Sequence, residues 1–419
     1  MILFLIQPYP SHYYPTFGLA HQLAKDGNTL VYTATEDSKE LIEREGFQAV
    51  VFNYLGEDLI KNWRAFIGVL LRSLLAPNAY AERQMQFTAA YCETKQVLEN
   101  YDVSRVYIDQ SLAEYYFFTK PYLEDIVILH TKLYSGRVPG IPPFNSTQIP
   151  TGSKWSDFRA FWSWRGELFK LRWRELLKRL AFLGKDEIFL WKKHCVDVDL
   201  VWKDHIDLQH ALNRGIKGVR QYILATSELE FDLFRLPGNV SFFESIPTKN
   251  EEHYFSKRYL NLLSTLRKEQ SYRLIYMSFG SFVGHGNQKV TAFYSAIINL
   301  VSSIPDTILC VSTGHSVLQL KPNHNTYIFS YVPQQHLLGF TDLFITHGGL
   351  GSVKEGLYHK VPMLVVPLNK YIDQPGNAAR IKAKGFGDFL NIDRYTEKEI
   401  RQKLLALLPE GISAQPLAS

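Results

Sequence analysis

The sequence predicts an α/β protein with two domains, each built on a doubly wound parallel sheet. Three observations lead to this prediction. The chain has 419 residues, more than one ordinary core holds, so two or three domains are expected. Short apolar runs alternate with helical patterns, first over residues 1–130 and again from Arg273 onward. Apolar types make up 46% of the chain and charged types 21%, close to the average of globular domains, which excludes disorder and fibres.

The N-terminal half alternates strand and helix patterns. Residues 2–6 form a continuous apolar run, which is typical of a strand covered on both faces. After a proline-rich loop, apolar residues recur at helical spacing, and Gly27 and Gly46 are suitable ends for the first two helices. Strands are expected at residues 2–6, 30–34, 50–52, 103–108, 126–130 and 222–225, and helices over 57–100, with an interruption near Pro77, and over much of 154–220.

A second alternating series begins at Arg273. Strands are expected at residues 274–278, 307–311, 327–329, 343–346 and 363–366, and helices at about 287–303, 351–359, 376–384 and 396–408. A polar and charged stretch separates the two series. The predicted organisation is therefore an N-terminal domain over 1–245, a linker over 246–270 and a C-terminal domain over 271–419.

The charge, cysteine and hydropathy patterns exclude several classes of protein. Lys and Arg number 46 against 41 Asp and Glu, and this net charge of +5 predicts no nucleic-acid partner. The three cysteines, Cys92, Cys195 and Cys310, form neither a disulfide framework nor a zinc knuckle, which favours a reducing compartment. Residues 1–6 lack the features of a signal peptide, and no run of ~18 apolar residues predicts a membrane span, so we expect a cytoplasmic protein.

Polar side chains after strands are informative because open α/β sheets bind ligands beyond the carboxyl ends of their strands. In the N-terminal domain, His12 lies in the loop after the first strand, and Asp109 directly follows the strand at 103–108. Both are expected at one sheet edge, where a carboxylate could orient a histidine that acts as a general base. The alternative is a solvated loop histidine and a helix-capping aspartate.

The strongest local motif runs from Phe344 to Gly356 and predicts a strand, a glycine-rich turn and a helix. Glycines let a phosphate approach the backbone closely, and the N–H groups at the start of a helix favour an anion. His347 and Ser352 add side-chain donors, and Glu355, one turn into the helix, could accept hydrogen bonds from ribose hydroxyls. The alternative is a common glycine-rich turn with a helix-capping serine.

Three further loops follow strands of the C-terminal domain and suit a nucleotide sugar. An aromatic ring can stack on a base, and carboxylate and amide groups suit sugar hydroxyls. The loops contain, in chain order, Gly280 and Ser281, then Tyr331, Val332 and Gln334, then Asp373 and Gln374. The alternative is a proline turn in the second loop and a helix cap in the third.

With these motifs, the chain resembles the family 1 glycosyltransferases of GT-B fold over nearly its whole length. The most specific part runs from residue 331 to about 387 and includes residues 346–355, 361–363 and 373–377. The resemblance implies two Rossmann-like domains facing across a cleft, the first for an acceptor and the second for a nucleotide sugar. A weaker resemblance, to bacterial carotenoid (zeaxanthin-type) glucosyltransferases, rests on residues 108–110, 138–143, 227–230 and 236–240.

The resemblance also implies roles for single residues. His12 matches the catalytic histidine of the family and Asp109 its acidic partner, while Glu355 would hold the ribose. The other donor residues would hold the base (Tyr331, Val332, Gln334), the diphosphate (Ser281 with Gly280 beside it, His347, Gly349, Gly351, Ser352) and the sugar (Asp373, Gln374). The chain departs from the usual family residues at Ser11, Tyr331 and Gly351.

The implied reaction is inverting transfer of a hexose, with glucose expected, from a UDP-sugar to a hydroxyl group of a lipophilic or phenolic acceptor. No cofactor, metal or obligate protein partner is expected; Asp197 and Asp199, near His194 and Cys195, fit a helix surface better than a metal site. The alternatives are a sugar-nucleotide 2-epimerase and a non-catalytic nucleotide-sugar or lipid-binding protein. The absence of Gly-x-Gly-x-x-Gly after either first strand argues against a dinucleotide dehydrogenase.

Six of the seven tryptophans lie within residues 155–202, among several arginines and lysines. Three interpretations fit this composition: a wall of the acceptor site, an aromatic core with a basic outer face, and shallow contact with an anionic membrane.

Overall fold

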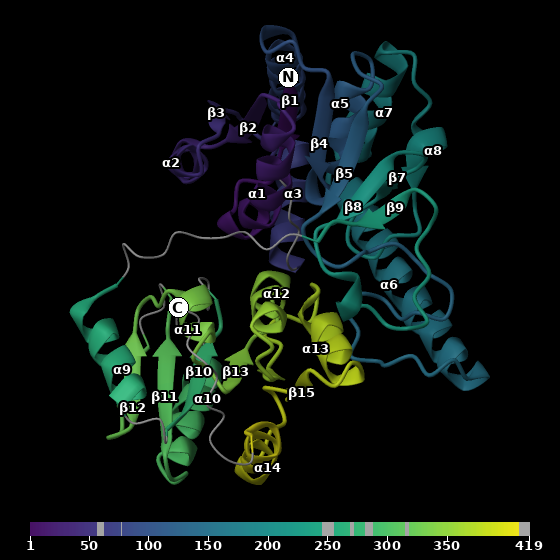
Figure 1. Cartoon of the computed structure of the whole chain (residues 1–419). Coiled ribbons are helices and arrows are strands. Elements are labelled where there is room, and N and C mark those ends of the chain that lie inside the picture. The colour runs from purple at the N-terminus through teal and green to yellow at the C-terminus, as the bar shows by residue number, and fades with distance from the viewer. Residues whose placement is uncertain are drawn as a thin grey trace. The chain divides into compact units, whose positions relative to one another are not determined.

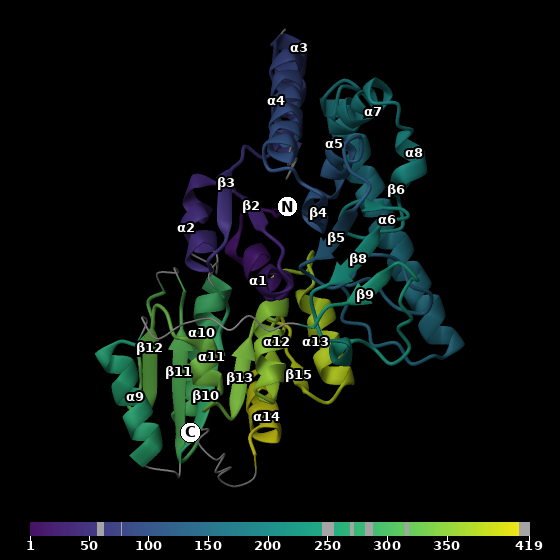
Figure 2. The same ribbon diagram turned by 45° about the horizontal axis from the view of Figure 1, so that its top comes forward.

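The computed structural model describes residues 1–56, 63–76, 78–244, 255–268, 272–280, 288–314 and 318–409, which fall into two compact units. The first unit comprises residues 1–143, 150–225 and 233–245, and the second comprises 144–149, 226–232 and the chain from 246 onward. Each unit contains one parallel sheet with helices on its faces (Figures 1 and 2). The predicted α/β class with two doubly wound sheets is confirmed.

Seven parallel strands form the sheet of the first unit, in the order β3-β2-β1-β4-β5-β8-β9. Their bounds are Ile2–Leu5 (β1), Leu30–Ala34 (β2), Gln48–Val51 (β3), Arg105–Asp109 (β4), Ile126–His130 (β5), Arg220–Ile223 (β8) and Val240–Phe242 (β9). The order of the strands reverses between the neighbours β1 and β4. This is the switch point at which open α/β sheets bind ligands.

The helices of the first unit largely follow the expected pattern. They are α1 (Pro10–Lys25), α2 (Glu36–Arg44), α3 (Trp63–Leu75), α4 (Ala79–Asn100), the 3-10 helix η1 (Gln110–Tyr115), α5 (Tyr116–Thr119), α6 (Lys154–Ala181), α7 (Glu187–Asp197) and α8 (Trp202–His205). The expected interruption at Pro77 lies outside the described residues. Where we expected more helix before residue 220, β6 (Ile206–Asp207) and β7 (Gly215–Ile216) instead form an antiparallel hairpin.

Successive side chains of the buried strands point to opposite faces of this sheet and form a hydrophobic core on each face. On β1, Leu3 and Leu5 belong to the core that includes Trp191 of α7, whereas Ile2 and Phe4 belong to the core under α1. A strand covered on both faces has no polar side, which explains the continuous apolar run that predicts it. The sheet is therefore fixed in register by two cores at once.

Six parallel strands form the sheet of the second unit, in the order β12-β11-β10-β13-β14-β15. The strands are β10 (Arg273–Ser278), β11 (Thr307–Ser312), β12 (Thr326–Phe329), β13 (Leu343–Thr346), β14 (Met363–Val365) and β15 (Gly387–Phe389). The helices are α9 (Lys257–Lys268), α10 (Gln288–Val301), α11 (Gln334–Leu338), α12 (Leu350–Tyr358), α13 (Gln374–Ala383) and α14 (Glu397–Leu407). Helix α9 lies within the stretch that we expected to be a linker.

Two segments from the N-terminal part of the sequence pack with the second unit, both against α13. A Cβ atom on Gly376 would lie 1.8 Å from the carbonyl oxygen of Phe144, so only glycine permits this close backbone approach. Arg380 Nε donates to Glu230 Oε1 at 2.7 Å, and both side chains are at most 5% exposed. These contacts fix 144–149 and 226–232, which includes the 3-10 helix η2 (Ser227–Leu229), on α13.

Candidate active site

His12 lies in the first turn of α1, and not in a loop as the sequence suggested. Strand β1 ends at Leu5, and α1 begins at Pro10, because proline at the first helical position presets the backbone angle and needs no hydrogen-bond partner. The prediction of a loop up to His12 was therefore wrong. The side chain of His12 is nevertheless buried at the end of β1, as the strand-end rule requires.

Asp109 is the last residue of β4 and is fully buried beside His12. Its Oδ2 lies 2.6 Å from Nδ1 of His12, and its Oδ1 accepts a hydrogen bond of 2.8 Å from the backbone N–H of Ser111. The carboxylate thus caps η1 with one oxygen and orients the imidazole with the other. Both contacts that the sequence offered for Asp109, with His12 and as a helix cap, are therefore present, whereas His12 is buried and not solvated.

The charge state of Asp109 follows from its neighbours. Burial alone would raise the pKa of this carboxyl group, but the charge and hydrogen bond of His12 oppose burial. Lys132 and the N–H of Ser111 act in the same direction, so the pKa of Asp109 lies below its ordinary value. An ionised carboxylate at Nδ1 requires that nitrogen to carry the proton, which leaves Nε2 of a neutral His12 as the basic nitrogen.

Two residues after β5 complete this cluster and were missed in the sequence. Thr131 Oγ1 lies 3.0 Å from Nδ1 of His12, and Lys132 Nζ lies 3.3 Å from Nε2. Strand β5 is the neighbour of β4 and ends at His130, so both residues obey the same strand-end rule. The signal was present, since the strand expected at 126–130 ends directly before these two residues.

The glycine-rich turn of the second unit holds the imidazole of His347 between glycines. The turn joins β13 to α12, and a Cβ atom on Gly349 would lie 2.6 Å from Nε2 of His347. A Cβ atom on Gly280 would lie 3.0 Å from Cε1 of the same ring. Gly348 has φ +84°, and its Cβ atom would meet Val365 at 2.5 Å. Glycine is therefore required at these positions, because a Cβ atom would collide with the ring of His347 or with Val365.

His347 is suited to donate a hydrogen bond from a neutral ring. Burial lowers the pKa of His347 to about 4. Its Nδ1 is buried and has no hydrogen-bond partner among the described residues. The adjacent first turn of α12 presents N–H groups that have no partner within the helix. Because a helix start attracts anions, the turn can hold a phosphate group.

Glu355 is held by two glutamines from the start of α11. Gln334 Nε2 donates to Glu355 Oε2 and, at 3.3 Å, to the hydroxyl of Ser352, while Gln335 Nε2 lies 3.4 Å from Glu355 Oε1. Tyr276 in turn donates to Gln334 at 3.1 Å. The sequence predicted Gln334, Ser352 and Glu355 as separate donor-binding residues, and the structure brings the three together.

The other predicted donor residues are placed as follows. Gln374 accepts hydrogen bonds of 2.8 and 2.9 Å from the N–H groups of Leu368 and Asn369, so it shapes its loop. Asp373 is buried and accepts from Asn377 at 3.1 Å. Tyr331 is 47% exposed and Val332 is buried; Gly351 has open space around its Cα, and Ser281 lies outside the described residues.

Asp197 ends α7, and Asp199 follows the helix with φ +57°. Within the described ranges, no group of three or more His, Cys, Asp or Glu residues could share a metal ion.

Comparison with known proteins concerns mainly the second unit. Residues 265–412 match the family "UDP-glucoronosyl and UDP-glucosyl transferase". UDP-glucuronosyltransferase 3A1 of Xenopus laevis is 37% identical over 131 residues, which are 30% of this chain and 24% of that protein. The match therefore spans about a quarter of the length of this curated relative.

Similarity to solved structures covers nearly the whole chain. The glycotransferase of kitacinnamycin matches with a TM-score of 0.65 and 17% identity, over 97% of this chain and 89% of that one. The glycosyltransferase VinC, solved in complex with DTDP, matches with a TM-score of 0.57 and 15% identity, over 98% and 91% of the two chains. At this identity the likeness establishes the fold alone, which is the expected GT-B fold with two Rossmann-like domains.

Proposed function

We propose that this chain, which belongs through residues 265–412 to the UDP-glucoronosyl and UDP-glucosyl transferase family, is a glycosyltransferase that uses a UDP-sugar. The sugar is glucose, and the acceptor is a hydroxyl group of a lipophilic or phenolic small molecule. The observation that carries a catalytic role is the buried His12–Asp109 pair, with its 2.6 Å hydrogen bond, at the switch point of the first sheet. A module that only bound nucleotide sugars would have no use for an oriented base.

The proposed reaction is an inverting displacement at the anomeric carbon. Nε2 of His12 takes the proton of the acceptor hydroxyl as its oxygen forms the new bond to that carbon. The bond from the carbon to the diphosphate oxygen breaks, and UDP leaves with the electron pair. Asp109 stabilises the imidazolium, which later releases its proton to solvent. General base catalysis of this kind contributes about 10²–10⁴-fold to the rate.

The donor is proposed to bind along the strand ends of the second unit. The first turn of α12, with His347 and Ser352, offsets the charge of the diphosphate, and Glu355 accepts from the ribose. Gln334 and Gln335 already orient that carboxylate. Tyr331 stacks on the base, and Asp373 with Gln374 faces the sugar. Because N–H, imidazole and hydroxyl donors surround the diphosphate, we propose that transfer proceeds without a metal, so a chelator should leave activity unchanged.

The test is a mass-spectrometric screen of UDP-sugars against carotenoids, flavonoids and other phenols. A glycoside product supports the proposal. Epimerised donor would show a 2-epimerase instead, and no change in either substrate would favour a binding protein.

Two substitutions assign the roles of His12 and Glu355. Removing the base with His12→Ala should abolish transfer but leave UDP binding intact, whereas Glu355→Ala should weaken donor binding. Full turnover by the first variant, or unchanged donor affinity in the second, would remove the assigned role.

A further inference from the structure

Helix α6 presents an unusual apolar stripe to solvent. Seven large apolar side chains recur along it at helical spacing, and each is 45% to 67% exposed: Trp155, Phe158, Trp162, Phe169, Trp173, Leu176 and Leu180. A surface helix normally turns such a stripe toward the core. The exposure of these side chains contradicts the interpretation of α6 as an aromatic core. Trp191 of α7, in contrast, is buried, as that interpretation expected.

The opposite face of α6 is the one that packs on the protein. Its buried residues are Ser156, Ala160, Trp164 and Ala181, and Trp164 donates to the carbonyl of Ile141 at 2.8 Å. Ala160 and Trp164 lie about half a helical turn away from Trp162 and Trp173 at 3.6 residues per turn. The exposed stripe is thus not the face of α6 that packs on the core of this unit.

Basic residues flank the stripe on both sides. Between residues 154 and 181 there are eight Lys or Arg residues and three Asp or Glu residues. Two of the three acids form ion pairs, Glu167 with Lys170 at 2.7 Å and Glu175 with Arg214. Exposed positions beside the stripe include Arg159, Arg165, Lys170, Arg172, Arg174 and Arg179. The outer face is therefore both apolar and cationic.

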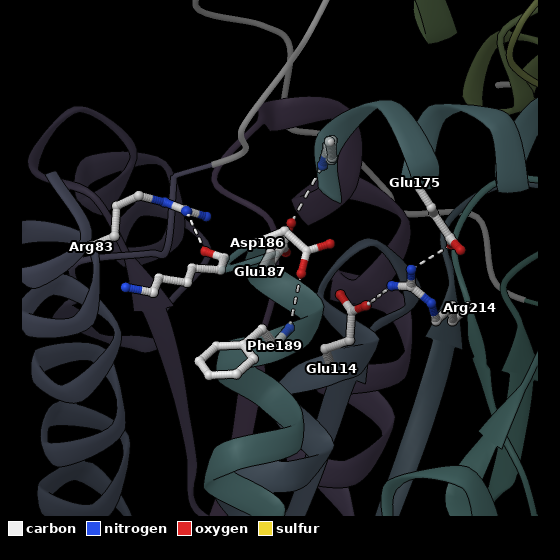
Figure 3. Close-up of polar contacts among 9 residues, drawn as sticks. Arg83, Glu114, Glu175, Asp186, Glu187, Phe189 and Arg214 are labelled. Atoms are coloured by element: carbon white, nitrogen blue, oxygen red, sulfur yellow. Dashed lines mark hydrogen bonds and ion pairs between the residues drawn. The ribbon is translucent and has the colours of Figure 1, made fainter. Parts of the chain in front are cut away.

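Ion pairs and stacking fix α6 to the first unit in this orientation. Arg214 bridges Glu175 of α6 and Glu114 of η1, the latter at 2.8 Å (Figure 3). Beyond the end of α6, Arg83 of α4 donates to the carbonyl of Lys185 at 2.8 Å and stacks on the ring of Phe182. Rotation of the stripe toward the core would break these contacts.

Helix α3, which contacts α6, repeats the pattern on a smaller scale. Its exposed side chains include Trp63, Ile67, Leu71 and Leu74, with Arg64 and Arg72 beside them. No helix among the described residues is long and apolar enough to cross a membrane. Both helices instead have the composition of segments that lie in the plane of a membrane interface.

We propose that the outer faces of α6 and α3 form a docking surface for an anionic phospholipid bilayer. Tryptophans favour the headgroup level, where the indole N–H stays hydrated and the ring is buried. Each Lys or Arg near an anionic leaflet adds electrostatic attraction to it. If α6 lay flat, the seven stripe residues would extend along about 38 Å of the surface. This charge complementarity favours anionic lipid over a second copy of this basic face.

Vesicle flotation of the full chain tests the proposal. Wild-type protein should float with phosphatidylcholine vesicles that contain about 30% phosphatidylglycerol, and binding should fall as salt rises from ~0.1 to ~0.5 M. The triple variant W162S/F169S/W173S should bind at least ~10-fold more weakly, since three large apolar groups leave the interface. The variant R165E/R172E should lose binding to anionic vesicles to a similar degree.

Matched controls separate the stripe from exposed apolar residues elsewhere. Val196→Ser on α7 and Tyr358→Ser on α12 remove exposed apolar groups of other helices and should bind vesicles like the wild type. Circular dichroism and thermal melting of every variant establish that it is folded. Loss of binding in these controls, or equal binding to vesicles of phosphatidylcholine alone, would overturn the proposal.

Two other occupants of the surface give distinct results. A second copy would appear in sedimentation velocity as a dimer that dissociates in W162S/F169S/W173S without vesicle binding. A soluble acceptor seated on the stripe would lose affinity in the same variant, again without vesicle binding by the wild type. Either result overturns the membrane assignment, and neither depends on whether sugar transfer is observed.

Discussion

Lys132 Nζ lies 3.3 Å from Nε2 of His12, the ring nitrogen that does not face Asp109. In the proposed mechanism, the ammonium therefore lies beside the nitrogen that takes the proton of the acceptor hydroxyl. As the acceptor oxygen loses its proton, negative charge develops on it, and a positioned cation stabilises that charge.

We predict that Lys132→Met lowers kcat/KM for transfer by about 10-fold or more and leaves UDP binding unchanged. Lys132→Arg should recover part of the rate, because it keeps the positive charge. Steady-state kinetics and UDP calorimetry measure the two effects. Equal loss of UDP affinity and turnover, or full activity in the methionine variant, would contradict this role.

Gly349 and Gly351 offer a matched pair of substitutions in one turn. A Cβ atom on Gly349 would lie 2.6 Å from His347 Nε2, whereas nothing lies within 4 Å of a Cβ atom on Gly351. Gly349 has φ −62°, an angle that alanine adopts without strain, so the effect is purely steric.

Gly349→Ala should displace the imidazole of His347 and weaken UDP binding by about 10-fold, since overpacking of this kind costs ~1–3 kcal/mol. Gly351→Ala should bind UDP like the wild type. Calorimetric titration with UDP measures the affinity of both variants. Equal affinities would mean that the ring of His347 does not contribute to diphosphate binding.

The sequence was sufficient for the long buried strands and their helices. Strands such as β2 and β13 are covered on both faces, so their apolar runs are unambiguous. The strands β9 and β15 have three residues each, and the hairpin β6–β7 has two per strand, too few for any period to be recognised. Their formation depends on neighbours that are distant in sequence.

The candidate sites were predicted to a similar extent. The strand-end rule predicted that His12 and Asp109 lie close together, because β1, which precedes His12, and β4, which ends at Asp109, are neighbours at the switch point. Helical spacing could not tell which face of α6 packs inward; the burial of Ala160 and Trp164 shows it. The pairing of Glu230 with Arg380 was also invisible, because 150 positions separate the two residues.

The buried pair of Glu230 and Arg380 should be important for the stability of the second unit. Arg380→Met would leave the carboxylate of Glu230 buried without a partner, at a cost of about 3–5 kcal/mol. The double variant R380M/E230L should regain most of this loss, because no charge then remains buried.

Lys384→Met, at the C-cap of the same helix, provides the control, since its partner Asp232 is exposed and such pairs contribute only ~0–1 kcal/mol. Differential scanning calorimetry follows the transition of the second unit. A loss in Arg380→Met no larger than in Lys384→Met would show that the buried pair contributes little.

Acid should destabilise both units through histidines whose pKa is lowered in the folded protein, with the largest effects at His130 and His347. Burial lowers the pKa of His130 and of His347 to about 4, while a histidine in the unfolded chain titrates near 6.5. As the pH falls from about 6.5 toward 4, these histidines bind protons in the unfolded chain but stay neutral in the folded protein. Stability is therefore complete above about pH 6.5 and decreases toward pH 4, by up to ~3 kcal/mol for each histidine.

Melting temperatures measured between about pH 7 and pH 4 should show this decline. His130→Asn should reduce the pH dependence of the first unit, because one group that titrates differently in the folded and unfolded states is gone. His21→Asn changes an exposed histidine of the same unit and should leave the dependence as in the wild type. An unchanged slope in His130→Asn would place the acid sensitivity elsewhere, with His194 as the next group to replace, since burial also lowers the pKa of that imidazole.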